Sequence, residues 1–182
     1  AGAKLVLERK KFSQCLEPYV KDIFGGICQG REEIEMTYVP TFRCTEDLNE
    51  TKENFFNELK RMINSDLRMG FTGIGPHRDD IDISINGVSA KSFGSQGQQR
   101  SIVLAMKLAE AKMLEEFSGE TPIVLLDDVL SELDSDRQNY LLNRLKDQQV
   151  FITCCDPNAV GKLEAGMRMR VEAGTVFPEE LE

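Results

Sequence analysis

The sequence lacks several features that would assign it to a common protein class. It has 182 residues but only one histidine, and its five cysteines are an odd number without Cys-x-x-Cys spacing, so we expect no zinc site. It contains no apolar run of about 18 residues, so we expect no membrane span. It opens without the charged and apolar segments of a signal peptide. Reduced thiols and a cytoplasmic location are therefore expected.

A complete phosphate-binding P-loop is also missing. That loop needs the pattern Gly-x-x-x-x-Gly-Lys-Ser/Thr, because its backbone surrounds the phosphates and its lysine reaches their β and γ oxygens. Gly25 and Gly30 have the correct spacing, but Arg31 and Glu32 follow where the lysine and the hydroxyl residue should stand. Any ATP site on this chain is therefore expected to be incomplete.

Positive charge is in short supply. The chain has 22 Lys and Arg against 31 Asp and Glu, which gives a formal net charge of −9. Non-specific DNA affinity comes mainly from Lys and Arg that neutralise phosphates, so this chain alone is expected to bind DNA weakly. Its hydrophobic fraction of 41% is enough for the packed core of one domain, or of one domain with an appendage.

The most informative segment is an apolar run that ends in two carboxylates. Residues 123–126 are Ile-Val-Leu-Leu, and Asp127 and Asp128 follow them directly. This pattern predicts a fully buried parallel strand whose carboxyl end carries the aspartates, where ligands bind in open α/β sheets. One carboxylate there can hold Mg²⁺, and the second can orient or deprotonate an attacking water. A buried strand with an acidic turn is the alternative for this segment alone.

A second segment, upstream of the first, predicts a helix start that can bind phosphate. Residues 94–98 are Gly-Ser-Gln-Gly-Gln, and apolar residues at helical spacing follow them over 98–117. The free N–H groups and the positive dipole end of a helix N-terminus favour a phosphate. Gly97 permits close approach to the backbone, and Ser95 can cap the helix and donate its hydroxyl to a phosphate. An ordinary capped helix is the alternative.

Together the two segments resemble the motifs of one protein family. Residues 94–98 are similar to the signature of ABC ATPases, and residues 126–134 are similar to a Walker B strand that continues into a D-loop, with Ser131 and Asp134 as its candidate residues. Residues 33–40 and 75–80 extend the resemblance to the RecF family of bacterial repair ATPases. It implies an α/β fold of the P-loop NTPase class, an ABC/SMC-like head fragment with part of a helical lid domain.

The resemblance also implies a domain organisation. Residues 1–48 would form the end of the lid domain and a return strand. Residues 49–182 would form the C-terminal ATPase lobe, which carries the signature, Walker B and the D-loop. The Walker A lobe would come before this region in a larger protein. This chain would then hold only half of an ATP site and would be inactive by itself.

For function, the resemblance implies a slow, DNA-stimulated ATPase of recombinational DNA repair and the SOS response. Two heads would close around ATP, with Asp127 holding Mg²⁺ chiefly through water and Asp128 in the place of the catalytic carboxylate. Ser95, Gly97 and Gln98 would contact the γ-phosphate held by the partner subunit. The full-length homodimer would bind DNA at gaps and single-strand/double-strand junctions. With RecO and RecR it would help to load RecA.

Other readings stay open at this point. An SMC-type or double-strand-break-repair head would carry long heptads, and an ABC transporter subunit would carry a switch histidine near Cys155. A non-catalytic dimerisation module could keep the same shape. His77 and Arg78 are expected to hold a lobe interface through salt bridges, although a place near nucleotide or DNA is the alternative.

The remaining patterns predict individual elements. A helix is expected over residues 4–27, with a kink or break near Pro18, and a strand over 32–39. The helix over 51–68 is expected to turn its large apolar residues inward: Phe55, Phe56, Leu59, Met62 and Ile63. Hairpins are expected to turn at residues 86–87 and 173–174. Between them in the sequence, a strand is expected at 122–127, a helix at 134–147 and a strand at 149–154.

Overall fold

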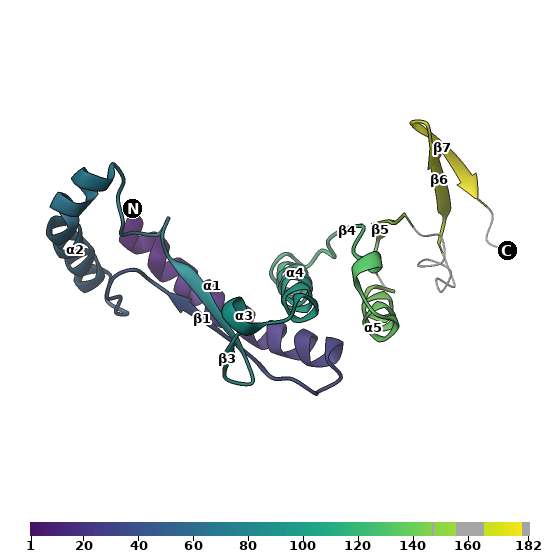
Figure 1. The fold of residues 1–182 in the computed structure, drawn as a ribbon, viewed down its shortest axis with the longest axis horizontal. Coiled ribbons are helices and arrows are strands. Elements are labelled where there is room, and N and C mark those ends of the chain that lie inside the picture. Colours follow the sequence, from purple (N-terminus) through teal and green to yellow (C-terminus); the bar gives the residue numbers. More distant parts are fainter. Residues whose placement is uncertain (147, 156–165, 180–182) are drawn as a thin grey trace. The chain divides into compact units, whose positions relative to one another are not determined.

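The computed structural model describes residues 1–146, 148–155 and 166–179, which form a mixed set of helices and strands (Figure 1). The chain divides into two compact units, Ala1–Pro122 and Ile123–Glu182. The boundary expected near residue 48 falls inside the first unit, where strands from its two sides pair with each other. The assignment of residues 1–48 to a lid domain stays a prediction. No helix in the described ranges is both long and apolar enough to cross a bilayer.

The first unit is built on the long helix α1 (Gly2–Ile27). This helix packs mainly against α4 (Gln96–Ser118) and also contacts the neighbouring sheet and α2. It runs without interruption through Pro18, whose side chain is exposed, so the chain does not break there. Its largest fully buried side chains are Phe24, Ile23, Ile27, Val6 and Val20.

A three-stranded antiparallel sheet lies beside this helix. Its order is β1 (Ile34–Val39), β2 (Asp80–Ile85) and β3 (Val88–Ser89). Apolar residues alternate with polar ones along β1 and β2, and the register pairs Ile34 with Ile85, so apolar side chains of both strands share one face. The predicted turn at residues 86–87 is confirmed, because both of its residues have positive φ.

Helix α2 (Leu48–Met69) begins and ends on sequence signals. The Asp47 side chain accepts a hydrogen bond from the Glu50 N–H, and Gly70 ends the helix in the left-handed conformation at φ 77°. The predicted inward face is wrong in part, since Phe56 is 57% and Ile63 is 55% exposed. The first unit covers only one side of α2, where Phe55 stacks on Phe42 with ring centroids 4.4 Å apart. Phe56 and Ile63 lie on other sides of the helix and are exposed to solvent.

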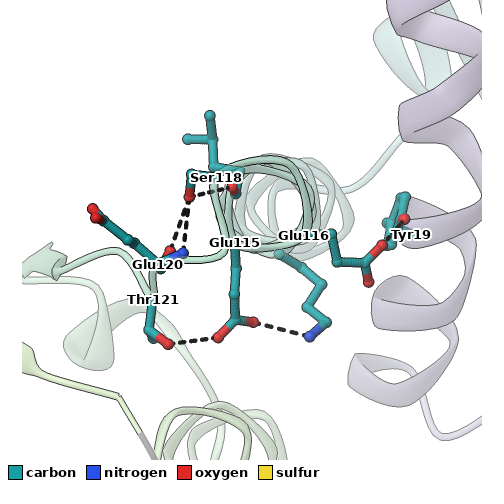
Figure 2. A network of polar contacts seen from close by, with 8 residues as sticks. Tyr19, Glu115, Glu116, Ser118, Glu120 and Thr121 are labelled. Carbon is teal, nitrogen blue, oxygen red and sulfur yellow. Dashed lines mark hydrogen bonds and ion pairs between the residues drawn. The ribbon is translucent and has the colours of Figure 1, made fainter.

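The short helix α3 (Ala90–Phe93) leads into α4, the helix predicted after the glycine-rich segment. Figure 2 shows how α4 ends. Gly119 adopts a left-handed φ of 72°, and the Ser118 hydroxyl donates to the Leu114 carbonyl oxygen and accepts from the Glu120 N–H. These contacts turn the chain sharply out of the helix.

The same end of α4 is held by side chains on two sides (Figure 2). The Glu115 carboxylate accepts hydrogen bonds from the Lys112 ammonium and the Thr121 hydroxyl, 2.9 and 2.7 Å away, and these lower the pKa of Glu115. The Tyr19 hydroxyl, on α1, donates to the Glu116 carboxylate, and this hydrogen bond raises the pKa of Tyr19. The segment that leaves α4 is therefore tied back to the helix, and the helix is tied to α1.

The second unit contains a parallel strand pair and one helix. Strand β4 (Val124–Asp127) pairs in parallel with β5 (Val150–Thr153), with Asp127 opposite Thr153. The 3₁₀ helix η1 (Leu130–Glu132) and the helix α5 (Ser135–Leu145) connect them. The core of this unit consists of leucines: Leu126, Leu130, Leu133, Leu141 and Leu145.

The prediction of a fully buried β4 is wrong for this structure. Leu126 is buried, but Leu125 is 74% and Ile123 is 59% exposed, and so is Phe151 of β5 at 56%. Alternate residues of a strand point to opposite faces, and within this unit only one face of the pair is covered. Parallel sheets normally have both faces covered.

The described chain ends in a hairpin of β6 (Arg168–Glu172) and β7 (Thr175–Glu179). Its turn at residues 173–174 was predicted, and both turn residues have positive φ. All residues of β7 are exposed.

Candidate nucleotide-binding site

Ser95 begins helix α4, as the sequence predicts. Its backbone is extended, and its hydroxyl oxygen accepts a hydrogen bond from the Gln98 N–H at 3.2 Å. The Gln98 side-chain oxygen accepts in turn from the Ser95 N–H at 2.8 Å. This reciprocal pair is a capping box, and it fixes the first turn of the helix. The Ser95 hydroxyl proton is not used by this pair, so it can be donated to an anion at the helix start.

The residue before Ser95 must be glycine for the short helix α3 to join α4, and it is Gly94. A β-carbon at Gly94 would lie only 2.4 Å from the carbonyl oxygen of Ala90, the first residue of α3. The Gly94 N–H donates to that same oxygen at 3.0 Å. Because a larger residue would collide with backbone atoms, only glycine lets α3 pass directly into Ser95 and α4.

Gln98 is held inside the first unit at both ends of its amide. Its oxygen faces the Ser95 N–H, and its nitrogen donates to the Glu32 carboxylate at 2.7 Å. Gly97, in the first turn of the same helix, has its carbonyl oxygen bound by the Ser101 hydroxyl at 2.8 Å. The side chain of Gln98 is thus committed to positioning the helix start, whereas the hydroxyl of Ser95 is exposed at it.

Asp127 stands at the carboxyl end of β4, and a neighbouring strand fixes its side chain. The Thr153 hydroxyl of β5 donates to one Asp127 carboxylate oxygen at 2.5 Å. The same Thr153 oxygen accepts from the Asp128 N–H at 3.1 Å. Asp127 is exposed, so its second oxygen is accessible to a cation. The structure therefore supports the predicted position of a carboxylate at the end of a parallel strand.

Asp128 has an unusual backbone conformation. Its φ is 53°, in the left-handed region that residues other than glycine rarely adopt and that aspartate tolerates better than most. Two interactions hold it there: its N–H donates to the Thr153 carbonyl oxygen at 3.1 Å, and its own carbonyl accepts from the Ser131 hydroxyl at 2.8 Å. The strained turn directs the strand abruptly into η1.

The two predicted D-loop residues have local structural tasks. Ser131 closes the turn after Asp128, as described above. Asp134 caps α5, because its carboxylate accepts a hydrogen bond from the Arg137 N–H at 3.0 Å. Both are exposed, so these tasks leave room for a contact with another chain.

The residues near 75–80 form a tightly bonded loop around Asp79. Its carboxylate accepts hydrogen bonds from the Tyr38 hydroxyl and from the N–H and hydroxyl of Thr41, the latter two at 2.8 and 2.9 Å. Burial, and next the hydrogen bond to Asp79, raise the pKa of Tyr38 well above its usual value. The guanidinium of Arg9, on α1, donates to the Pro76 carbonyl oxygen of the same loop.

His77 and Arg78 are exposed on this loop rather than paired with carboxylates. A His77 ring nitrogen lies 2.9 Å from the Thr72 carbonyl oxygen, and the Arg78 guanidinium stacks 4.5 Å above the ring of Phe71. The expected salt bridges of these two residues are absent from the described part of the chain. The salt bridge in this region joins Asp80 to Lys91 at 2.8 Å and lowers the pKa of Asp80.

The structure thus brings the predicted residues together in two separate groups. Ser95, Gly97 and Gln98 share one helix start in the first unit. Asp127 and Asp128 share one strand end in the second, where Ser131 and Asp134 follow. Cys155, at the position of a switch histidine, is exposed just after β5.

The sequence reasoning missed two residues of these groups. Glu32 was noted only as a mismatch to a P-loop and as the first residue of a predicted strand, yet it binds Gln98 across 66 positions of sequence. Thr153 was noted only as part of a strand, yet it binds both aspartates. The only sequence signal for Thr153 was its place near the end of the strand predicted at 149–154, and no sequence signal connected Glu32 to Gln98.

A magnesium ion fits the second group. Within the described residues no cluster of three or more histidine, cysteine or acidic side chains could enclose a metal. Magnesium does not require such a cluster, because it keeps several waters and takes one or two carboxylates together with phosphate oxygens. An exposed Asp127, oriented by a neighbouring hydroxyl, has the right chemistry for that kind of site.

Comparison with known proteins gives a consistent result. No protein-family model matches the chain. The DNA replication and repair protein RecF of Clostridium acetobutylicum is 45% identical over 163 residues, which cover 90% of this chain and 43% of that protein. RecF of Rippkaea orientalis is 39% identical over 181 residues, which cover 97% of this chain and 48% of that protein. The chain thus spans a little less than half the length of these relatives.

Solved structures agree. The recombination mediator protein RecF bound to ATP has a TM-score of 0.81 and 32% identity, over 98% of this chain and 47% of that one. A structure described for ATP-driven dimerisation and DNA-stimulated activation of SMC ATPases has a TM-score of 0.57 at 12% identity, which shows the fold alone. The fold is that of an ABC/SMC-type ATPase head in the P-loop NTPase class. The chain belongs to the RecF family, and it matches the C-terminal half of the family's proteins.

Proposed function

We propose that this chain supplies the signature and Walker B parts of a composite ATP site in a RecF-type DNA-repair ATPase. The observation that carries the proposal is the start of α4, where Gly94 and the capping box present the Ser95 hydroxyl and a helix N-terminus together. Such a start binds a phosphate through its N–H groups and its dipole. The phosphate would be the γ-phosphate of ATP bound to the Walker A lobe of a second subunit.

Each residue of the site then has a defined task. Ser95 donates its hydroxyl to the γ-phosphate, Gly97 allows the close approach, and Gln98 holds Ser95 in place. In the other group, Asp127 holds Mg²⁺, which when bound neutralises charge on the phosphate oxygens. Asp128 orients the attacking water and accepts its proton.

The side chain of Asp128 suggests a slow reaction. In the ABC ATPases that the sequence resembles, the catalytic carboxylate at this position is usually a glutamate, and aspartate is shorter by one methylene. The attacking water is therefore reached less well. Slow hydrolysis suits an ATP-dependent switch, because the heads stay associated until the γ-phosphate is lost. ATP held between two heads makes its full set of contacts only in the dimer, so ATP binding stabilises the dimer by mass action.

DNA and protein partners belong to the proposal for the full-length protein. We propose that the ATP-bound homodimer binds DNA at gaps and single-strand/double-strand junctions, with its ATPase stimulated by DNA, and acts with RecO and RecR in loading RecA in the cytoplasm. The name of the relatives, DNA replication and repair protein, supports this role. The net charge of −9 argues that the lysines and arginines for DNA come from other parts of the dimer.

The proposal is tested first at Ser95 in the full-length protein. Ser95→Arg places a bulky side chain at the helix start and is expected to abolish ATP-driven dimerisation, measured by light scattering after gel filtration with a slowly hydrolysed ATP analogue. Asn57→Arg, at an exposed position of α2, adds the same side chain elsewhere and is the control. Binding of a fluorescent ATP analogue should stay unchanged in both. Normal dimerisation of Ser95→Arg would remove the signature role.

A second experiment separates an enzyme from a dimerisation module of the same shape. Asp127→Ala in the full-length protein should abolish phosphate release while the protein stays folded. If the unmodified protein dimerises with ATP but never hydrolyses it, the chain belongs to a non-catalytic module. If the upstream part of the protein proves to be a long heptad coiled coil, an SMC-type or double-strand-break-repair head becomes the better description.

A further inference from the structure

Glu32 lies in the connection between α1 and β1, far in sequence from the signature helix, and is half-buried. One of its carboxylate oxygens accepts a hydrogen bond from the Gln98 side-chain nitrogen at 2.7 Å. The other accepts from the Cys28 thiol at 3.2 Å. The carboxylate therefore bridges the start of α4 and the end of α1, where the buried Cys28 caps the helix.

The bridge continues to Ser95 without a gap. Gln98 uses its nitrogen for Glu32 and its oxygen for the Ser95 N–H, 2.8 Å away. The orientation of the Gln98 amide is thereby fixed, because a flipped amide would place its nitrogen against the Ser95 N–H and its oxygen against the carboxylate. Glu32 thus determines which way Gln98 faces, and Gln98 completes the cap that positions the Ser95 hydroxyl.

No ion pair among the described residues explains the position of Glu32. In the described ranges it takes part in no ion pair, and the guanidinium of the adjacent Arg31 donates instead to the Cys28 carbonyl oxygen at 3.0 Å. Within the described part of the chain, this half-buried carboxylate accepts two hydrogen bonds, one from Cys28 and one from Gln98. A hydrogen bond to a charged acceptor is stronger than one between neutral groups.

We propose that Glu32 is a positioning residue for the signature motif, which couples the end of α1 to the contact of Ser95 with the γ-phosphate. The inference rests on the proposed function and adds to it a residue outside the signature, Walker B and D-loop. It also adds a route: a movement of the end of α1 pulls on Glu32, turns the Gln98 amide and displaces the helix start. ATP-driven association thus depends on the state of α1.

The test uses the full-length protein and measures the dissociation constant of its dimer by analytical ultracentrifugation with a slowly hydrolysed ATP analogue. Glu32→Ala removes the acceptor, and we expect the contact at each site to weaken roughly tenfold, the effect of losing one hydrogen bond to a charged group. Because a dimer contains two such sites, its dissociation constant should rise by up to about a hundredfold. Glu33→Ala, which removes the adjacent exposed carboxylate, should leave dimerisation unchanged.

Two further variants distinguish positioning from a general loss of structure. Glu32→Gln keeps an acceptor oxygen for Gln98 and should restore dimerisation to within about threefold of normal. In a double-mutant cycle, Glu32→Ala should add nothing to Gln98→Ala, because the first residue acts through the second. If the two effects add, Glu32 stabilises the fold in some other way and the inference is wrong.

The outcomes also separate this inference from the function on which it rests. If the unmodified protein does not dimerise with the ATP analogue, the proposed function fails. If it does dimerise, and Glu32→Ala dimerises equally well while binding the fluorescent ATP analogue, only the positioning role fails. A lower thermal midpoint of Glu32→Ala does not obscure the result, because the double-mutant cycle is decided by additivity and not by the size of either effect.

Discussion

The Asp79 carboxylate offers the sharpest test of what holds the first unit together. It accepts hydrogen bonds from the Tyr38 hydroxyl on β1 and from the N–H and hydroxyl of Thr41 just after that strand. Thr41 in turn accepts from the Gly75 N–H at 2.9 Å. One side chain therefore ties the loop before β2 to the end of β1, beside the buried cluster of Val6, Phe42 and Ile74.

The expected loss on removing this carboxylate follows from its partners. Each hydrogen bond to a charged group contributes about 1.5–3 kcal/mol, and an abandoned partner that water can reach recovers part of that. For three donors around a half-buried group, Asp79→Ala should lower the free energy of unfolding by about 2–4 kcal/mol. Asp79→Asn keeps one acceptor oxygen of similar shape and should lower it by about half as much.

Urea unfolding followed by circular dichroism measures the change, provided that the slope m is the same for each variant. Asp80→Ala is the matched control. The Asp80 carboxylate is exposed, and among the described residues it accepts from the Lys91 ammonium and the Ile81 N–H, so its loss should have a much smaller effect. If Asp79→Ala lowers stability by no more than Asp80→Ala, the carboxylate does not hold the loop.

Three other changes have equally definite outcomes. Gly94→Ala places a β-carbon 2.4 Å from the Ala90 carbonyl oxygen without relaxation, and it should weaken ATP-driven dimerisation of the full-length protein at least about tenfold. Gly25→Ala, with open space around the added β-carbon, is the control and should not weaken it. Equal dimer dissociation constants for the two variants would refute the steric reasoning. The raised pKa of Tyr38 means that the folded protein keeps this proton while the unfolded chain releases it near pH 10.0, so stability should fall as pH rises above that value. Tyr38→Phe should remove one tyrosine that ionises above the usual pH from an absorbance titration, and an unchanged titration would contradict the assignment. Asp128→Asn should trap the ATP-bound dimer of the full-length protein, and rapid phosphate release by that variant would exclude Asp128 as the group that accepts the proton.

Much of the local structure could be predicted because its signals are short in sequence. The cap at Ser95 depends on Gln98 three positions later, and the turns at 86–87 and 173–174 depend on two adjacent residues each. The parallel character of β4 followed from its unbroken apolar run, and pairing with β5 confirms it. The cap and the turns are decided by interactions between close neighbours in the sequence. The parallel strand was indicated by its apolar composition alone.

The errors occur where distant contacts decide. Phe56 and Ile63 fit the apolar pattern of α2 as well as Phe55 does, but only Phe55 meets the Phe42 ring, and nothing in the helix itself identifies that side. Leu125 and Leu126 look alike in the sequence, yet one lies 74% exposed because alternate residues face opposite sides of a pair that is covered on one side.

The sequence by itself determined the signature segment and the two aspartates after an apolar strand, because each is a run of adjacent residues whose types indicate its chemistry. These two segments were also enough to indicate the family. Only the tertiary structure decided that Glu32 fixes the Gln98 amide, that Thr153 binds both aspartates and that Asp79 closes the loop before β2. These contacts span 66, 25 and 38 positions of the chain. Hydrogen bonds require atoms within a few ångströms of each other, and folding alone brings such distant residues to that separation.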